Sequence, residues 1–287
     1  ILKCNMNFKK LNSHAKINLS LNVIQRLPNK YHKIESLITF IQFSDEIKIK
    51  LTNNLKHKIY FFGNFSKGID QNNTVARLFN LLEKKNLIKS KKFEIRIKKN
   101  IPQKSGMGGG SMNAACILKY LMKKKFINIS SKKAKEIAYE IGSDVALGLK
   151  KKNSILFKNG KIIQVNKKLN FNVLVAMPNF GCSTKNIFSR VKKFSKTSYF
   201  NANKSLFKIM NLMHSKNDLE KIVLKKYSKI KNLKYFLLSM PKVLFVRMTG
   251  TGSAVVAYFK TKNDAKKAAK IFKIKYNNYW YIISKTI

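Results

Sequence analysis

Acidic residues are scarce in this chain of 287 residues. Twelve Asp and Glu side chains stand against 60 Lys and Arg, which gives a formal net charge of +48. Such an excess suggests a nucleic-acid or anionic-membrane partner, but the lysines are spread from end to end and accompany many Asn, Ile, Phe and Tyr residues. We therefore interpret the charge as a composition bias. It predicts salt-sensitive, non-specific RNA binding and no specific nucleic-acid partner.

Cysteine, histidine and long apolar runs are also rare. The three cysteines, Cys4, Cys116 and Cys182, are far apart and form no C-x-x-C pair, so neither a zinc site nor a disulfide framework is predicted. The histidines do not come at metal-ligand spacing, and we expect no protein-held transition metal. No apolar run approaches the ~20 residues of a membrane span, and no signal-peptide core opens the chain. We therefore expect a cytoplasmic protein without membrane contact.

Glycine is scarce too, at 12 residues, yet four of them lie between Gly106 and Gly110. Strand-like alternation over residues 93–98 precedes this loop, and apolar residues at helical spacing follow it. Ser111 is predicted to cap that helix. Glycines let main-chain N–H groups converge on an anion, and a helix N-terminus favours negative charge. The sequence therefore predicts a phosphate-binding loop, because an ordinary connection needs only one or two glycines.

Two better-known phosphate loops do not fit this stretch. A P-loop requires Gly-x-x-x-x-Gly-Lys-Ser/Thr, and no glycine precedes Lys104-Ser105 at that distance. A Rossmann fingerprint requires Gly-x-Gly-x-x-Gly and an acidic residue about 20 positions later, whereas Lys123-Lys124-Lys125 dominates the downstream region. The loop therefore belongs to another class of phosphate site.

Other stretches give the organisation of the chain. Residues 15–23 alternate with period two and predict a half-buried strand, with Lys16, Asn18 and Ser20 on its solvated face. Asp45-Glu46 is predicted to turn the chain between two strands. The pattern changes near residue 170 and becomes mostly helical, so we predict two domains, residues 1–169 and 170–287.

Two smaller features add candidate site residues. Asp144 follows Gly142, a predicted helix C-cap, and the residues alone leave open whether it forms a turn or acts chemically. A second glycine loop, residues 249–253, stands between two predicted strands near the end of the chain.

Three separated motifs now agree in order and spacing. They are Ala15-Lys-Ile-Asn-Leu, Pro102-x3-Gly106-Met-Gly-Gly-Gly-Ser, and Thr249-Gly-Thr-Gly-Ser. Together they resemble the motifs of the GHMP kinases, over nearly the whole chain. Tyr31-His32, Asp144-Val145 and Ser183-Thr184-x-x-Ile-Phe188 are most similar to members that phosphorylate the 2-hydroxyl of a cytidine diphosphate sugar alcohol in non-mevalonate isoprenoid synthesis. The alternatives are a GHMP kinase for another small alcohol, of homoserine or mevalonate type, and a catalytically weakened, basic RNA-binding relative.

The resemblance implies an α+β fold of two lobes, ribosomal-S5-like and ferredoxin-like, with the active cleft between them. It implies ATP as donor, Mg²⁺ delivered with the ATP, a small-molecule acceptor, and a monomer or weak homodimer. The implied catalytic residues are Asp144, as proton acceptor, and Lys16. The implied ATP-binding residues are Asn73, Pro102, Gln103, Lys104, Ser105, Gly106, Met107, Gly108, Gly109, Gly110, Ser111 and Met112. The implied substrate-binding residues are Asn18, Tyr31, His32, Thr184, Phe188, Gly250, Thr251 and Gly252.

Several positions depart from the family pattern. Lys104-Ser105 stands where the family usually has small glycines, Met112 replaces a serine, Ala146 replaces a proline, and Lys30 replaces a glycine. Met112 removes a hydroxyl that could hold phosphate or Mg²⁺, whereas the charge of Lys104 could compensate. The resemblance therefore predicts the same chemistry with an altered phosphate loop.

Overall fold

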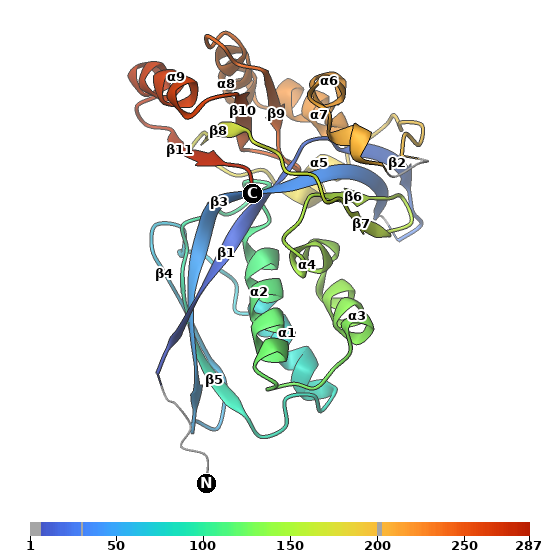
Figure 1. Cartoon of the computed structure of the whole chain (residues 1–287), viewed down its shortest axis with the longest axis vertical. Helices are drawn as coiled ribbons and strands as arrows, with labels where there is room; N and C mark the ends of the chain where they lie inside the picture. The colour runs from blue at the N-terminus through green and yellow to red at the C-terminus, as the bar shows by residue number, and fades with distance from the viewer. Residues whose placement is uncertain (1–6, 30, 200–202) are drawn as a thin grey trace. The chain divides into compact units, whose positions relative to one another are not determined.

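A computed structural model describes residues 7–29, 31–199 and 203–287 of the chain (Figure 1). Cys4 and Lys30, discussed above, lie outside these residues. The chain divides into two compact units, each discontinuous in sequence. The first holds residues up to Ala15 together with Ser44–Pro102 and Gly108–Lys151, and the second holds Lys16–Phe43, Gln103–Met107 and Lys152–Ile287. The predicted lobe boundary at residue 170 stays a prediction.

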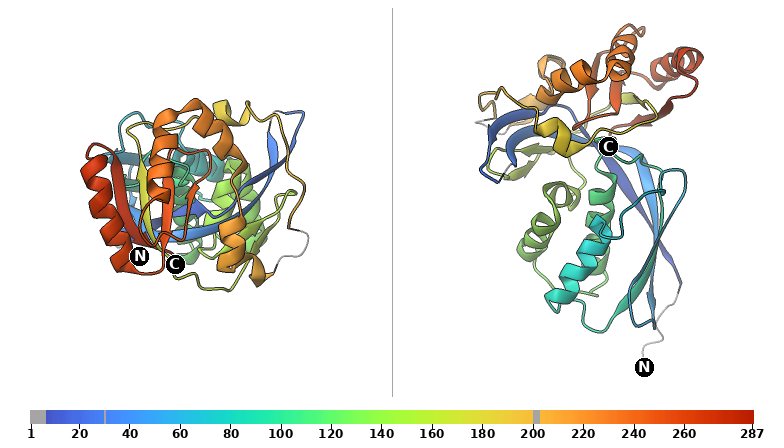
Figure 2. Two further views of the ribbon diagram at one scale, coloured as in Figure 1. Left: turned by 90° about the horizontal axis from the view of Figure 1, so that it is seen from above. Right: turned by 180° about the vertical axis from the view of Figure 1, so that it is seen from behind.

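The first unit packs helices on a sheet. Strand β4 (Lys58–Phe62) pairs parallel with β5 (Lys92–Lys98), and β5 pairs antiparallel with the second half of β3 (His32–Thr52). Figures 1 and 2 show the helices on one side of these strands. The helices are α1 (Thr74–Lys84), α2 (Gly109–Lys123), α3 (Ser131–Ile141) and α4 (Ser143–Gly148). Phe93, Ile95 and Ile97 alternate inward and are fully buried, as the period-two pattern of this strand predicts.

The second unit contains a separate four-stranded sheet. Its order is β11-β8-β10-β9, all antiparallel, so β8 lies inside the sheet as its apolar sequence predicts. The strands are β8 (Asn172–Met177), β9 (Phe245–Met248), β10 (Val255–Phe259) and β11 (Trp280–Lys285). Helices α8 (Ser228–Leu238) and α9 (Lys262–Lys275) pack on this sheet (Figure 2). Phe259 of β10 and Phe272 of α9 are fully buried and belong to the same hydrophobic cluster.

The remaining elements of the second unit are short. Strand β2 (Asn22–Arg26), which follows β1 (Lys9–Asn18), and strand β6 (Ser154–Leu156) both pair with the first half of β3. Strands β6 and β7 (Ile162–Gln164) form an antiparallel hairpin, as the turn sequence Asn159-Gly160 between them predicts. The other helical segments are α5 (Thr184–Phe188), η1 (Lys204–Phe207), α6 (Ile209–His214) and α7 (Asp218–Lys226).

The turn predicted at Asp45-Glu46 is wrong, because β3 runs without interruption from His32 to Thr52. The carboxylate of Asp45 is fully buried and accepts hydrogen bonds from the main-chain N–H groups of Asn100 and Ile101, both at 2.8 Å. Asp favours turns when its side chain bonds its own neighbours. Here the partners lie some 55 positions away, so tertiary bonding keeps the strand extended.

The strand predicted over residues 15–23 is also partly wrong. It is broken between Asn18 and Asn22, and its polar face is not solvated. Lys16, Asn18 and Ser20 are all at most 5% exposed. Alternation of polar and apolar residues therefore marks two buried faces here, one apolar and one hydrogen-bonded.

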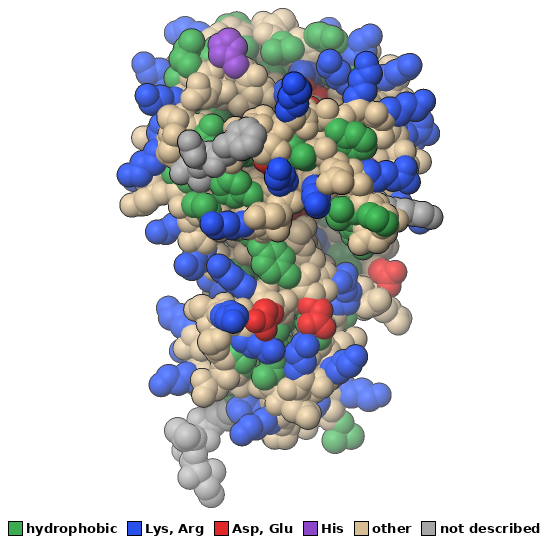
Figure 3. All heavy atoms as spheres, turned by 90° about the vertical axis from the view of Figure 1, so that its right-hand side faces the viewer, with side chains coloured by type: hydrophobic (Ala, Val, Ile, Leu, Met, Phe, Trp, Pro, Cys, Tyr) green, Lys and Arg blue, Asp and Glu red, His purple; other side chains and the backbone are tan. Residues whose placement is uncertain are grey.

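Positive charge is spread over the face of the molecule that Figure 3 draws. Lys and Arg side chains are scattered over this face and form no single stripe. Within the described residues no helix is both long and apolar enough to cross a bilayer.

Candidate active site

The glycine loop belongs to both units, and its first half, Gln103–Met107, lies in the second. Four successive carbonyl oxygens of this half accept hydrogen bonds from the protein. Lys104 O accepts from Cys182 N and Ser253 N at 3.1 and 3.2 Å, and Ser105 O accepts from Ala254 N at 3.2 Å. Gly106 O accepts from Thr249 Oγ1, and Met107 O accepts from Lys16 N, each at 3.2 Å.

These hydrogen bonds turn the carbonyl oxygens of the loop toward the protein and so orient the loop. In the described part of the chain, the N–H groups of Gly106, Met107 and Gly108 donate no hydrogen bond. Main-chain amides that converge without carbonyls between them form an anion-binding surface. The loop geometry therefore fits phosphate oxygens.

Gly106 is packed directly against the second glycine loop. A Cβ atom at Gly106 would lie 2.0 Å from the carbonyl oxygen of Thr249, and the residue has φ +80°. Gly250, at φ +53°, faces it from the other side, since its own Cβ would lie 3.1 Å from Gly106 O. The two glycine motifs thus form one backbone-to-backbone contact between segments far apart in the sequence. A side chain at Gly106 would force the loops apart.

In the first unit, helix α2 begins at the end of the glycine loop. Its N-cap is Gly108, in the left-handed conformation, and no side chain caps it. The prediction that Ser111 is the cap is wrong, because Ser111 lies inside the first turn. The first-turn N–H groups of a helix have no intrahelical acceptor, and the helix dipole makes this end positive. A cap without a side chain leaves those donors for a ligand.

A buried ion pair lies beneath this helix end. Asp45 accepts from Asn113 Nδ2 of α2 at 3.0 Å, pairs with the ammonium of Lys99, and binds the two main-chain N–H groups of residues 100 and 101. Lys99 Nζ lies 3.1 Å from where a Cβ of Gly109 would stand. One carboxylate therefore ties β3, the end of β5 and α2 together.

Replacing this carboxylate is expected to destabilise the fold strongly. Asp45→Asn leaves the buried Lys99 charge without its counter-ion, and we expect the free energy of unfolding to fall by about 3–5 kcal/mol. Glu136→Gln, which breaks the exposed pair with Lys133, is the control and should cost at most about 0.5 kcal/mol. Urea unfolding curves of both variants give the comparison, and equal costs would contradict the role of Asp45.

Lys16 is held by a buried network in the second unit. Its ammonium donates to Asn18 Oδ1 at 2.9 Å, and Asn18 Nδ2 donates to Ser36 Oγ at 2.8 Å. Asn18 N also donates to Thr249 Oγ1 at 3.0 Å. The side chain of Asn18, expected to contact the substrate, is therefore engaged with Lys16 and Ser36.

The other sequence-predicted site residues of the first unit are placed as follows. Asp144 is half-buried in the first turn of α4, two residues after the cap Gly142. Asn73 caps α1, as the pattern predicts, with Oδ1 accepting from Val75 N and Ala76 N. Met112 is 3% exposed and its sulfur faces Gly148, so its side chain belongs to the core. Pro102 is buried at the start of the loop.

The predicted base-binding residues lie in the second unit. The ring of His32 is 5.1 Å from that of Phe188, tilted by 34°, and Tyr31 is 73% exposed. Among the described residues His32 Nε2 is buried without a hydrogen-bond partner. Thr184 Oγ1 is 3.2 Å from Thr251 Oγ1, so the second glycine loop reaches the N-terminus of α5. His32 and Phe188 are brought together, and Tyr31 offers an exposed ring.

Comparison with known proteins decides the family. Residues 73–151 match the family described as GHMP kinases N terminal domain, and residues 196–278 match GHMP kinases C terminal. A protein of Pelagibacter ubique (strain HTCC1062) named 4-diphosphocytidyl-2-C-methyl-D-erythritol kinase is 50% identical over 282 residues, which cover 98% of this chain and 100% of that protein. The chain belongs to the GHMP kinase family. A protein of the same name from Buchnera aphidicola subsp. Schizaphis graminum (strain Sg) is 34% identical, over 96% of this chain and 92% of its own.

Solved structures agree with the fold of a GHMP kinase. A structure of 4-(cytidine 5'-diphospho)-2C-methyl-D-erythritol kinase matches with a TM-score of 0.79 at 20% identity, covering 96% of this chain and 99% of that one. Mevalonate kinase of Methanococcus jannaschii matches with a TM-score of 0.68 at 14% identity, covering 99% of each. The predicted α+β fold and family resemblance are thus confirmed, and the chain is a small-molecule kinase.

Two residues that support the candidate site are not predicted from the sequence. Thr249 binds Asn18 and Gly106, and Asp45 supports the helix end from below. Thr249 is the first residue of the motif Thr249-Gly-Thr-Gly-Ser, but no local pattern in the sequence predicts which residues it contacts. Asp45 does have a sequence signal, because it is an acidic residue beside an apolar stretch in a basic chain, but this signal is also typical of a turn.

The imidazole of His32 is expected to titrate below the usual range. Burial lowers the pKa of His32 from its ordinary 6.5, and the nearby Arg26 lowers it further. The folded protein therefore binds a proton at His32 less readily than the unfolded chain does. The free energy of unfolding should fall as the pH drops below about 6.5, and the imidazole should be uncharged at pH 7. An NMR titration should give a midpoint below 6.5 that rises partly in Arg26→Gln. A midpoint at or above 6.5 would contradict the burial of this ring.

Proposed function

We propose that this GHMP kinase transfers the γ-phosphoryl group of ATP to the 2-hydroxyl of 4-diphosphocytidyl-2-C-methyl-D-erythritol. The observation that carries the proposal is the 50% identity, over essentially the full length of both chains, to the Pelagibacter ubique protein of that name. Kinases of this family use ATP. The carbonyls of the glycine loop point into the protein, and the N–H groups that remain available suit the phosphates of ATP.

In the proposed reaction Asp144 accepts the proton of the 2-hydroxyl while the hydroxyl oxygen forms a bond to the γ-phosphorus. The bond from that phosphorus to the bridging oxygen breaks, and ADP leaves. Lys16 orients the acceptor hydroxyl and stabilises negative charge as it develops. Phosphoryl transfer needs positioning and charge stabilisation more than covalent catalysis, and both residues supply this.

The nucleotide base of the acceptor would be recognised by His32 and the rings beside it. Stacking on Tyr31 and Phe188 supports a flat base, and the buried Nε2 of His32 offers a hydrogen bond to its polar edge. The neutral imidazole expected at pH 7 carries one donor and one acceptor nitrogen, which matches the mixed edge of cytosine. We propose this as the source of specificity for a cytidylyl substrate.

Mg²⁺ is proposed to enter bound to ATP. The described residues contain no group of three His, Cys, Asp or Glu side chains that could hold a metal. Mg²⁺ commonly binds through substrate phosphates, one or two carboxylates and water. The ion would supply charge neutralisation on the phosphates, and the chain would supply the amides around them.

The proposal is tested by incubating the purified chain with ATP, Mg²⁺ and a panel of acceptors. The panel contains the cytidylyl methylerythritol, its uridylyl analogue, mevalonate and homoserine, and NMR locates the new phosphate. We expect phosphorylation at the 2-hydroxyl of the cytidylyl compound and much slower reaction with the others. Faster turnover of mevalonate or homoserine would instead assign the chain to another acceptor class.

A further inference from the structure

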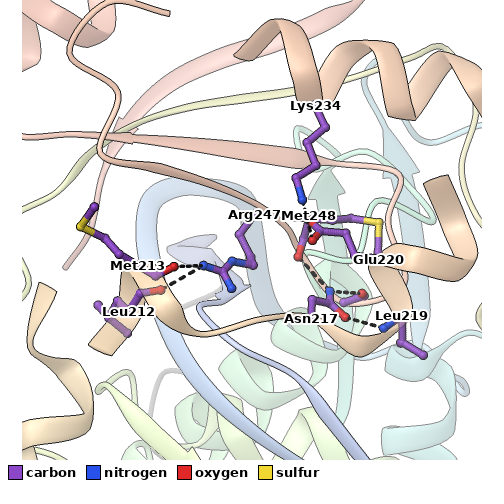
Figure 4. Close-up of polar contacts among 9 residues, drawn as sticks. Leu212, Met213, Asn217, Leu219, Glu220, Lys234, Arg247 and Met248 are labelled. Atoms are coloured by element: carbon purple, nitrogen blue, oxygen red, sulfur yellow. Dashed lines mark hydrogen bonds and ion pairs between the residues drawn. The ribbon is translucent and has the colours of Figure 1, made fainter. Parts of the chain in front are cut away.

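Helix α7 begins with a buried asparagine whose amide faces two ways (Figure 4). Asn217 Oδ1 accepts from Leu219 N at 3.0 Å and so caps the helix. Its Nδ2 donates to Met248 O at 2.9 Å and to Gly250 O at 2.8 Å. Both donor hydrogens and the acceptor are thus used at once, and the residue is 3% exposed. Only an amide side chain can do all of this.

Glu220, in the first turn of α7, holds the same stretch of backbone. Glu220 Oε1 accepts from Met248 N at 2.7 Å, and its other oxygen pairs with Lys234 Nζ at 2.7 Å (Figure 4). Met248 is therefore bound at its N–H by Glu220 and at its carbonyl by Asn217. This helix start fixes the place where strand β9 enters the second glycine loop.

From that loop, contacts continue to the proposed catalytic lysine. Thr249 lies between the two carbonyls that Asn217 binds. Its hydroxyl accepts from Asn18 N at 3.0 Å and lies 3.2 Å from Asn18 Oδ1. Asn18 Oδ1 in turn accepts from Lys16 Nζ at 2.9 Å. Asn217, Thr249, Asn18 and Lys16 all belong to the second unit.

We propose that Asn217 is a positioning residue for phosphoryl transfer. It holds the main chain on both sides of Thr249, Thr249 fixes Asn18, and Asn18 fixes the ammonium of Lys16. The inference rests on the proposed function, in which Lys16 orients the acceptor hydroxyl. Misplacing a reacting or orienting group by about 1 Å can cost 10²-fold in rate, so a loosened loop should lower kcat.

The test replaces Asn217 by an isostere that keeps the cap. Asn217→Asp retains the acceptor for Leu219 N and suits a helix N-terminus, but it cannot donate and places a carboxylate against two carbonyls. We expect kcat to fall by about 10–100-fold, with a smaller change in KM for the cytidylyl substrate. Asn203→Asp makes the same exchange at the exposed cap of η1 and should keep wild-type kinetics.

A second readout does not depend on activity. Limited acylation followed by mass spectrometry measures how accessible the Lys16 ammonium is, with the exposed Lys270 as internal standard. Lys16 is 5% exposed, and we expect its acylation to rise several-fold in Asn217→Asp. Asn217→Ser, which keeps a capping oxygen without adding charge, should raise it too, and it replaces the Asp variant if that variant does not fold.

The variant Asp218→Asn distinguishes a positioning role of Asn217 from a purely structural role of this helix start. Asp218 anchors the same helix start by accepting from Val23 N and Ser195 Oγ, both at 2.8 Å, and its carboxylate forms no hydrogen bond or ion pair with the second glycine loop among the described residues. We expect this variant to lower the thermal midpoint without changing Lys16 acylation. Unchanged acylation in the folded Asn217 variants, or an equal rise in Asp218→Asn, would overturn the inference. If the wild-type chain fails to phosphorylate the cytidylyl substrate, the proposed function fails, and the acylation result still decides the contact chain.

Discussion

Asp144→Asn is expected to lower kcat by roughly 10²–10⁴-fold with little change in ATP affinity. The amide keeps the size of the side chain but cannot accept the proton of the acceptor hydroxyl. Single-turnover kinetics with saturating ATP and cytidylyl substrate measure the chemical step, and nucleotide titration measures the affinity.

The matched control for this prediction is Asp264→Asn. Asp264 also lies in the first turn of a helix, where it accepts from Thr261 Oγ1 at 2.6 Å, and the family resemblance gives it no role in the site. Both exchanges remove a carboxylate from a positive helix end. A wild-type rate in Asp144→Asn would remove Asp144 from the mechanism, and an equal loss in Asp264→Asn would show a general effect of charge.

Gly106→Ala is expected to disrupt stability and turnover together. A Cβ at this position would lie 2.0 Å from Thr249 O, which is a main-chain atom and cannot rotate away as the end of a side chain could. The left-handed conformation adds about 1–2 kcal/mol for any residue with a Cβ. We expect the free energy of unfolding to fall by about 3 kcal/mol or more, and kcat by at least about 10²-fold as the amides move off the phosphates.

Gly160→Ala is the control that separates the two effects at Gly106, the clash with Thr249 and the strain of the left-handed backbone. Gly160 has φ +81°, against +80° at Gly106, but nothing lies within 4 Å of the position that its Cβ would take. Its cost should therefore be the conformational part alone, about 1–2 kcal/mol, with unchanged kcat. Denaturant unfolding and steady-state assays of the two variants compare them directly. Equal effects would show that the close approach of the two glycine loops is unimportant.

Local patterns predicted much of the fold and the loop. The alternation at Phe93 to Lys98, the glycines after it and the apolar spacing of α2 depend on short-range geometry, so they could be recognised from the residues in order. The three motifs predict the GHMP kinase family, and the comparisons with known proteins confirm this prediction. What remains a prediction is the role of each site residue.

Long-range contacts explain the errors. The turn prediction at Asp45 is wrong because its partners, Lys99 and Asn113, lie far along the chain and leave no local signal. The sequence predicts Lys16 and Asn18 on a solvated face, because the partners of Asn18, Ser36 and Thr249, are distant in the sequence. Ser111 fits the composition of a cap, but the left-handed Gly108 ends the loop and starts the helix first.

Asn217 is a further residue whose long-range contacts could not be predicted from the sequence. Asn217-Asp218 before an apolar run is typical of a helix N-terminus, and the cap could have been predicted from it. The second use of its amide, on Met248 and Gly250, depends on where another strand ends. A tertiary contact of this kind leaves no periodic or spacing signal.

A crystal structure with a non-hydrolysable ATP analogue and the cytidylyl methylerythritol tests the central claim most directly. We expect the β- and γ-phosphates within hydrogen-bonding distance of main-chain N–H groups between Gly106 and Ser111, and the 2-hydroxyl within reach of the Asp144 carboxylate. A triphosphate bound elsewhere, or a carboxylate directed away from the acceptor hydroxyl, would contradict the account.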